Sequence, residues 1–176
     1  MRRFLLALLL SVLACAAHAA GPATGVLAPN ALGNSRDGKP VTLEQFRGRI
    51  VVVTFWASWC TYCLRELPVL DSLQRNAGNL LTVVAVNVKD TPEDYRIMMR
   101  QMKRYAITQS RDVDGGIADQ YGVDGYPSLW IIDPEGKVAA SHSGYGEDSL
   151  DAIVNEINAI LRVQASRNAP QQQAAG

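Results

Sequence analysis

The feature that most constrains the fold is an apolar strand followed almost at once by a helix. Residues 50–56 read Ile-Val-Val-Val-Thr-Phe-Trp, a nearly continuous run of apolar and β-branched side chains. Such a run is typical of a strand that is covered on both faces of its sheet. Residues 61–76 then place leucines at helical spacing before Gly78, namely Leu64, Leu67, Leu70 and Leu73. Together the two elements predict an α/β fold.

The remaining patterns extend this pair into a central mixed sheet flanked by helices. They predict a second buried strand at 80–88, helices at 90–105 and up to Tyr121, a hairpin of strands at 128–133 and 138–142, and a last helix from about Glu147. Residues 26–40 are rich in turn formers. Within them, Asp37-Gly38 predicts an N-terminal hairpin in which residues 26–28 pair with residues 41–43.

The first nineteen residues have the pattern of a signal peptide. Arg2-Arg3 precedes an apolar run at 4–14, and Ala17-His18-Ala19 places small residues where a signal peptidase reads. The apolar run is too short to cross a bilayer as a helix, which takes about 20 residues. We therefore predict cleavage of residues 1–19.

Two other fates of this segment stay open at this point. Residues 11–15 resemble a loose lipobox, in which Cys15 would carry a lipid, and an uncleaved membrane anchor is the other alternative. In all three cases we expect export to the periplasm. The exported chain is then one domain at 20–163, followed by a polar segment at 164–176 that we predict to be disordered.

Charge and cysteine content exclude several functions. The chain has 17 basic and 17 acidic residues, and no basic surplus indicates nucleic acid as a partner. Apart from Cys15, its cysteines are Cys60 and Cys63, which would close too small a loop to act as a structural staple. In an oxidising compartment, redox chemistry explains such a pair better. We expect a monomer.

Cys60-Thr61-Tyr62-Cys63 stands where the predicted strand gives way to the predicted helix. The first N–H groups of a helix lack internal partners and its dipole is positive there, so a thiolate at this position is stabilised. We expect Cys60 to have a lowered pKa and to act as the nucleophile. Cys63, one turn further in, is suited to resolve a mixed disulfide with a client. The redox-active disulfide itself would be the reactive group, with no cofactor and no metal.

The segment Phe55-Trp56-Ala57-Ser58-Trp59-Cys60-Thr61-Tyr62-Cys63 resembles the active-site segment of thioredoxin-like proteins. Residues 37–43, Gly48 and the segment from Val123 to Val138 resemble the exported TlpA/ResA/CcmG (DsbE) branch of thiol:disulfide oxidoreductases. This resemblance covers roughly residues 26–161. It implies a thioredoxin fold with an N-terminal β-hairpin and a helical insertion after the second core strand. It also implies thiol–disulfide exchange with client proteins, often as a reductant in cytochrome c or cytochrome oxidase maturation.

The resemblance assigns roles to individual residues. Cys60 and Cys63 match the attacking and resolving cysteines. Tyr126-Pro127 matches the dipeptide whose proline is cis, and clients would pair with the backbone of Tyr126 as an added strand. Glu66 matches a glutamate of this branch that could move protons to and from the sulfurs; a solvated surface glutamate is the alternative.

Client contact is also expected from the residues around the cysteines. Trp59, Thr61 and Tyr62 join Tyr126 and Pro127 as candidate substrate-binding residues. One departure from ordinary thioredoxins lies in the preceding strand, where Thr54 occupies the position of a buried aspartate. Since a threonine hydroxyl does not take up a proton at neutral pH, either Glu66 or water would serve.

Other functions fit the residues less well. A structural zinc site needs four ligands, more than the mature cysteines and His142 supply. A peroxiredoxin-type peroxidase would be expected to have Pro and Thr at the positions that Val53 and Ala57 occupy. A Cu(I) carrier using the same two thiols is the alternative from another class.

The direction of electron flow is the open question within the enzyme class. Neither Thr61 nor Tyr62 supplies a cation that would strongly favour the dithiolate, so a reductant is expected. The resemblance implies that its electrons would come from a membrane thiol–disulfide carrier. A disulfide-forming or isomerising enzyme is the alternative.

Overall fold

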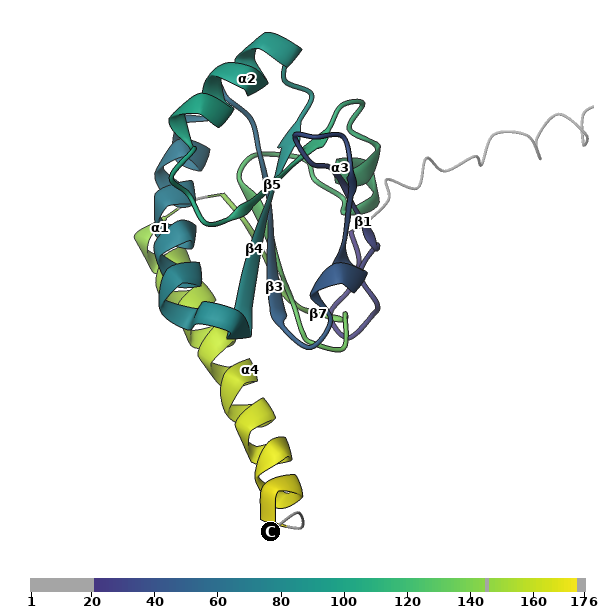
Figure 1. Ribbon diagram of the computed structural model, residues 1–176, viewed down its shortest axis with the longest axis vertical. Helices are drawn as coiled ribbons and strands as arrows, with labels where there is room; N and C mark the ends of the chain where they lie inside the picture. Colours follow the sequence, from purple (N-terminus) through teal and green to yellow (C-terminus); the bar gives the residue numbers. More distant parts are fainter. Residues whose placement is uncertain (1–20, 145, 174–176) are drawn as a thin grey trace, which may run out of the picture.

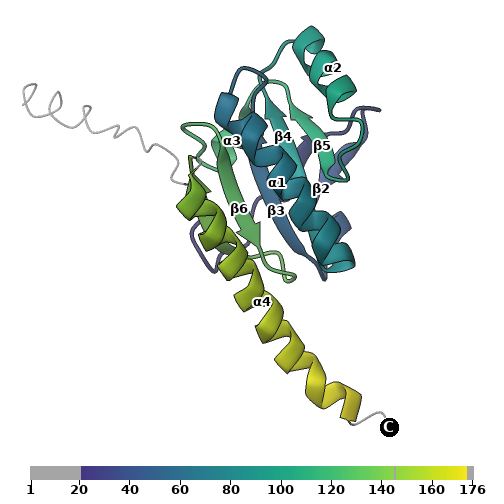
Figure 2. The same ribbon diagram turned by 90° about the vertical axis from the view of Figure 1, so that its left-hand side faces the viewer.

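The computed structural model describes residues 21–144 and 146–173, which form a seven-stranded mixed sheet with helices on both faces (Figures 1 and 2). The predicted signal peptide and Cys15 lie outside the described residues. The strands are β1 (Ala31–Asn34), β2 (Pro40–Thr42), β3 (Ile50–Trp56), β4 (Leu81–Val88), β5 (Thr108–Asp112), β6 (Ser128–Ile132) and β7 (Val138–Ser143). The helices are α1 (Thr61–Ala77), α2 (Pro92–Gln101), α3 (Gly116–Gln120) and α4 (Glu147–Gln173), with short 3-10 turns at Leu43–Phe46 and Gly78–Leu80.

The sheet order is β2-β1-β5-β4-β3-β6-β7, which puts β3 near the middle. β3 runs parallel to β4 and antiparallel to β6, and β4 runs parallel to β5. Because parallel strands end at the same edge, the residues that follow β3 and β4 lie next to each other. The active-site motif follows β3 at that edge.

Side chains of β3 alternate between two apolar cores, as a strand covered on both faces requires. Ile50, Val52 and Trp56 pack with α1, α2 and α4, whereas Val51, Val53 and Phe55 face the side of α3. Every residue of the strand is buried. Figure 2 shows α1 and α4 side by side on the first of these faces. The predicted α/β fold, with its buried central strand, is confirmed.

An aromatic cluster fills the core on the α3 side. The ring of Phe55 lies 5.1 Å from that of Tyr121 and 5.5 Å from that of Trp130, between centroids, and the Tyr121–Trp130 distance is 5.3 Å. The Tyr121 hydroxyl donates to the carbonyl of Pro29 at 2.8 Å. This bond ties the N-terminal segment to the core.

The N-terminal hairpin exists, but its first strand differs from the prediction. β1 comprises residues 31–34 and pairs with β2, whereas residues 26–28 lie against the β6–β7 hairpin through a bridge between Leu27 and Lys137. The turn explains why β1 lies at residues 31–34. The Ser35 N–H and hydroxyl both donate to the Lys39 carbonyl, so the pairing of β1 with β2 begins directly beside the turn. A strand at 26–28 would lie too far back along the chain to join it.

Strand β5 was not predicted, because its residues Thr-Gln-Ser-Arg-Asp contain no apolar side chain. Its inward-facing residues are polar yet buried, and Ser110 donates to the Leu32 carbonyl. The predicted helical insertion is confirmed as α2, which lies between β4 and β5.

The last helix begins at Glu147 as predicted, with Ile153 and Ile157 buried against the sheet. It continues to Gln173, so the prediction of disorder from residue 164 differs from the structure over residues 164–173. Its four Gln and two Ala residues favour a helix, whereas Pro170 within it does not. No helix among the described residues has the length and hydropathy needed to cross a membrane.

Candidate active site

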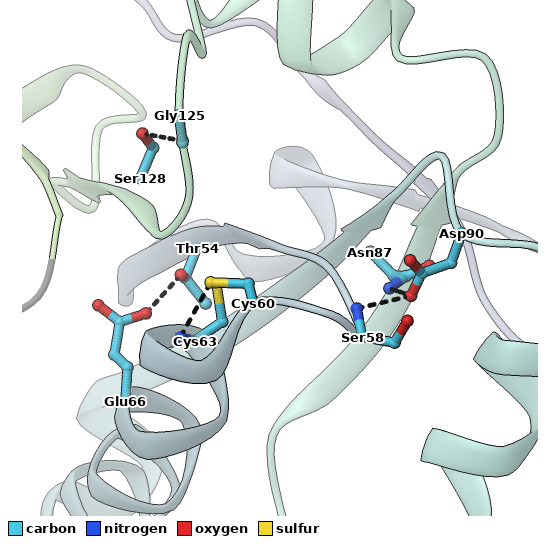
Figure 3. Close-up of a disulfide and its surroundings, with 9 residues drawn as sticks. All are labelled: Thr54, Ser58, Cys60, Cys63, Glu66, Asn87, Asp90, Gly125 and Ser128. Carbon is cyan, nitrogen blue, oxygen red and sulfur yellow. Dashed lines mark hydrogen bonds between the residues drawn. A yellow bond between two sulfur atoms is a disulfide. The ribbon is translucent and has the colours of Figure 1, made fainter.

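Cys60 and Cys63 form a disulfide at the N-terminus of α1, with their Cα atoms 5.3 Å apart (Figure 3). Cys60 is the N-cap residue of the helix, and its Sγ accepts the Cys63 N–H at 3.1 Å. Once the bond is reduced, this N–H and the helix dipole stabilise a thiolate on Cys60. Cys60 is 6% exposed and Cys63 is fully buried. Cys60 is therefore the more exposed of the two cysteines.

A buried carboxyl group lies on one side of the disulfide (Figure 3). Glu66 is only 2% exposed, and its Oε2 accepts a hydrogen bond from the Thr54 hydroxyl at 2.8 Å. Burial raises the pKa of Glu66 from 4.5 to about 7, and the Thr54 hydrogen bond opposes this rise. The alternative of a solvated glutamate is thus wrong. The Glu66 carboxyl group, held by Thr54, therefore has a pKa near neutrality and lies one helical turn from Cys63.

A second buried carboxyl group holds the loop on the other side of the disulfide (Figure 3). Asp90 Oδ2 accepts the Ser58 backbone N–H at 2.8 Å and the Asn87 side-chain amide at 2.7 Å. The carbonyl of Asp90 accepts a hydrogen bond from Arg111 Nη2. Ser58 stands two residues before Cys60, so Asp90 holds the loop that leads into Cys60.

Sequence analysis did not identify Asp90 or Asn87, because neither belongs to the Cys-x-x-Cys motif. The signal that could have found them is the parallel pairing of the strands at 50–56 and 81–88. Polar residues at the end of the second strand then fall beside the loop that follows the first.

We expect Asp90→Ala to reduce the free energy of unfolding by about 1–3 kcal/mol, because the Ser58 N–H and the Asn87 amide lose their common acceptor. Asp90→Asn keeps one oxygen acceptor and should retain more of the stability. Denaturant unfolding of the oxidised protein measures both effects. Asp119→Ala removes an exposed carboxylate and serves as the control. Equal stability of Asp90→Ala and wild type would contradict the role given to Asp90.

The predicted cis peptide bond between Tyr126 and Pro127 is confirmed. It directly precedes β6, whose first residue Ser128 pairs with Phe55 near the end of β3. The Ser128 hydroxyl donates to the Gly125 carbonyl at 2.8 Å and so closes the loop (Figure 3). The sheet register therefore brings the cis-proline loop to the edge from which the Cys60 loop leaves.

The predicted client-binding residues, apart from Pro127, are at least partly exposed. Trp59 is 72% exposed, and its ring meets that of Tyr126 edge-to-face, 5.7 Å between centroids. Thr61 and Tyr62 are exposed as well, whereas Pro127 is buried. The disulfide is therefore bordered by exposed aromatic surface, which in folded proteins often marks an interaction site.

His142 takes no part in this site, since its Nε2 lies 2.8 Å from Glu156 Oε2 on α4. No group of three or more His, Cys, Asp or Glu side chains in the described part of the chain is placed to hold a metal ion. A disulfide that caps the helix after a central parallel strand, facing a cis-proline loop, defines a thioredoxin-like thiol:disulfide oxidoreductase.

Comparison with known proteins agrees with this class. Residues 24–141, well over half of the chain, match the AhpC/TSA family, and the chain belongs to that family. It is 31% identical over 121 residues to the thioredoxin-like protein YneN of Bacillus subtilis, covering 68% of this chain and 71% of that protein. It is 30% identical over 127 residues to the thiol-disulfide oxidoreductase ResA of the same organism, covering 70% and 69%.

A solved structure extends the agreement to the fold. The crystal structure described as a DsbE thiol:disulfide interchange protein from Chlorobium tepidum superposes with a TM-score of 0.74 at 31% identity. The alignment covers 80% of this chain and 99% of that one. The thioredoxin fold and the oxidoreductase class are confirmed.

Proposed function

We propose that this protein is an exported reductant of client-protein disulfides in the periplasm. The observation that carries the proposal is that the first two turns of α1 hold both an N-capping Cys60 and the buried Glu66, whose pKa is raised to about 7. A carboxyl group of that pKa can give and take a proton at neutral pH. The resemblance to proteins of cytochrome c and cytochrome oxidase maturation indicates disulfides of proteins in those pathways as clients.

In the reduced protein, the Cys60 thiolate attacks one sulfur of the client disulfide and displaces the other as a thiolate. Cys63 then loses its proton, for which we propose the Glu66 carboxylate as acceptor. The Cys63 thiolate attacks Cys60 Sγ, re-forms the Cys60–Cys63 bond and releases the second client sulfur as a thiolate. The two client thiolates take up one proton from Glu66 and one from solvent, which gives the client dithiol. Two electrons pass from the protein to the client. A membrane thiol–disulfide carrier would restore the dithiol in the same way.

The client surface that we propose consists of Trp59, Thr61, Tyr62, Tyr126 and Pro127. The exposure of Trp59 and its contact with Tyr126 support this assignment. An extended client segment could add its backbone to that of Tyr126, so that affinity would not depend on a particular side chain.

The reduction potential of the Cys60–Cys63 couple tests the direction of electron flow. We expect a value nearer to the roughly −270 mV of thioredoxin than to the roughly −120 mV of DsbA, since neither residue between the cysteines is a cation. Equilibration with glutathione redox buffers, read by alkylation of the free thiols, measures it. A strongly oxidising value would assign the protein to disulfide formation instead. Tight stoichiometric Cu(I) binding together with negligible reductase activity would favour a copper carrier.

A further inference from the structure

A cleft of about 460 Å³ lies between the turn of the N-terminal hairpin and helix α2. Its lining includes neither cysteine, nor Glu66, nor a predicted client-binding residue, and it touches the redox site only through the bond from Arg111 to the Asp90 carbonyl. Asn34, Ser35 and Arg36 line it from the hairpin, and Tyr95 and Arg96 line it from α2. Arg111 of β5 also lines it. Pockets of about 300–1,000 Å³ are the usual size for small-molecule ligands.

The cleft carries an excess of positive charge. Arg36, Arg96 and Arg111 line it, and no acidic residue does. In the described part of the chain neither Arg36 nor Arg96 forms an ion pair. Asp37, beside Arg36 in the sequence, is instead paired with Lys39 at 3.0 Å. A concave surface lined by charges of one sign attracts ligands of the opposite sign.

The floor of the cleft has hydrogen-bonding groups that no described protein atom uses. Tyr95 is 8% exposed, and its buried hydroxyl has no hydrogen-bond partner. The Arg111 guanidinium lies 5.3 Å from the centre of the Tyr95 ring, and Arg111 Nε is likewise buried without a partner. Buried polar groups in folded proteins are nearly always paired. Two unpaired groups on residues that line an arginine-rich cleft support a ligand that supplies oxygen acceptors.

The electrostatics of Tyr95 support this geometry. Burial raises the pKa of Tyr95, and the positive charges of Arg111 and Arg36 act in the opposite direction. Guanidinium groups bind carboxylates and phosphates with two parallel hydrogen bonds, so these are the groups the cleft is suited to accept.

We propose that this cleft binds a small organic anion through a carboxylate or phosphate group, with Arg36 and Arg96 at the rim and Arg111 at the floor. Pro92, Met99 and Val113 also line the cleft and provide contact for the apolar part of such a ligand. The site does not depend on the redox function, since it uses the hairpin, α2 and β5 rather than the cysteines.

Isothermal titration of the oxidised protein with citrate and, separately, with glycerol 3-phosphate tests the proposal at constant ionic strength. We expect one-to-one binding of at least one probe, and the tighter one identifies the preferred group. Arg96→Gln and Arg36→Gln should each weaken that binding about tenfold or more, because each removes a charged hydrogen-bond donor. Both side chains are exposed, so the variants should fold.

Arg100→Gln is the matched control, because Arg100 is an exposed arginine of the same helix outside the cleft. Its affinity for the probe should equal that of the wild type. Absence of binding by both probes up to about 10 mM, a limit corresponding to very weak affinity, would overturn the proposal. An equal loss of affinity in Arg100→Gln and Arg96→Gln would also overturn it, since it would indicate unspecific attraction to a basic helix.

Discussion

Cys60→Ser should abolish disulfide reduction, with the rate falling by about 10³-fold or more, because a serine hydroxyl cannot replace the thiolate nucleophile. Cys63→Ser should stop the reaction halfway, since Cys60 can still attack but no second thiolate releases the client. The difference follows from the structure, in which Cys60 caps the helix and Cys63 is fully buried. Reduction of a disulfide-bonded model peptide, followed by chromatography, measures the rates.

The mixed disulfide provides the decisive observation for this pair. Cys63→Ser should accumulate a covalent adduct with client protein that disappears on reduction, and Cys60→Ser should not. The double variant, Cys60→Ser with Cys63→Ser, controls for adducts that form elsewhere on the chain. Adducts that accumulate in Cys60→Ser rather than Cys63→Ser would reverse the two roles.

Glu66→Gln should change how the stability of the oxidised protein depends on pH. The folded pKa of Glu66 is about 7 and its ordinary value is 4.5. Between these values the folded state binds more protons than the unfolded state, so the wild type loses stability as pH rises. The contribution of Glu66 is fully present below pH 4.5 and is lost as pH passes about 7. We expect Glu66→Gln to gain about 2–3 kcal/mol relative to wild type between pH 5 and pH 8.

Urea unfolding at several pH values measures this effect. Any change in stability that the introduced amide causes equally at every pH drops out when the pH values are compared. Glu93→Gln is the matched control, because Glu93 is an exposed glutamate in the first turn of α2. Its curve should run parallel to that of the wild type. If the curve of Glu66→Gln also ran parallel to the wild type, the raised pKa of Glu66 would be wrong.

The parts of the fold that the sequence predicted are those with strong local signals. The apolar run at 50–56 and the leucine spacing after Thr61 each identify an element without reference to the rest of the chain. The Cys60–Cys63 pair is found in the same way, from its place between the two elements. Strand β5 has no such signal: its polar side chains are buried by pairing with β1 and β4, which depends on contacts between distant segments.

In the candidate site, too, local spacing could be predicted from the sequence and contacts between distant segments could not. Glu66 could be proposed from its spacing to Cys63, but its burial depends on Thr54 and on the packing of α1 against the sheet. Asp90 acts across the β3–β4 pair, from a position 30 residues after Cys60. Such a contact follows from strand register, which a single sequence does not reveal without the topology of the sheet.

The N-terminal segment has a consequence for how the chain folds as it is made. Gly25 donates its N–H to the carbonyl of Val138, and Ala28 donates to that of Gly136, partners more than one hundred residues later in the chain. A ribosome delivers the N-terminal end first, so this segment has to wait unpaired until nearly the whole domain has emerged. Contacts between such distant residues form late, because a long loop must close first. We therefore expect residues 25–28 to be among the last parts of the domain to form their hydrogen bonds, although they are synthesised early.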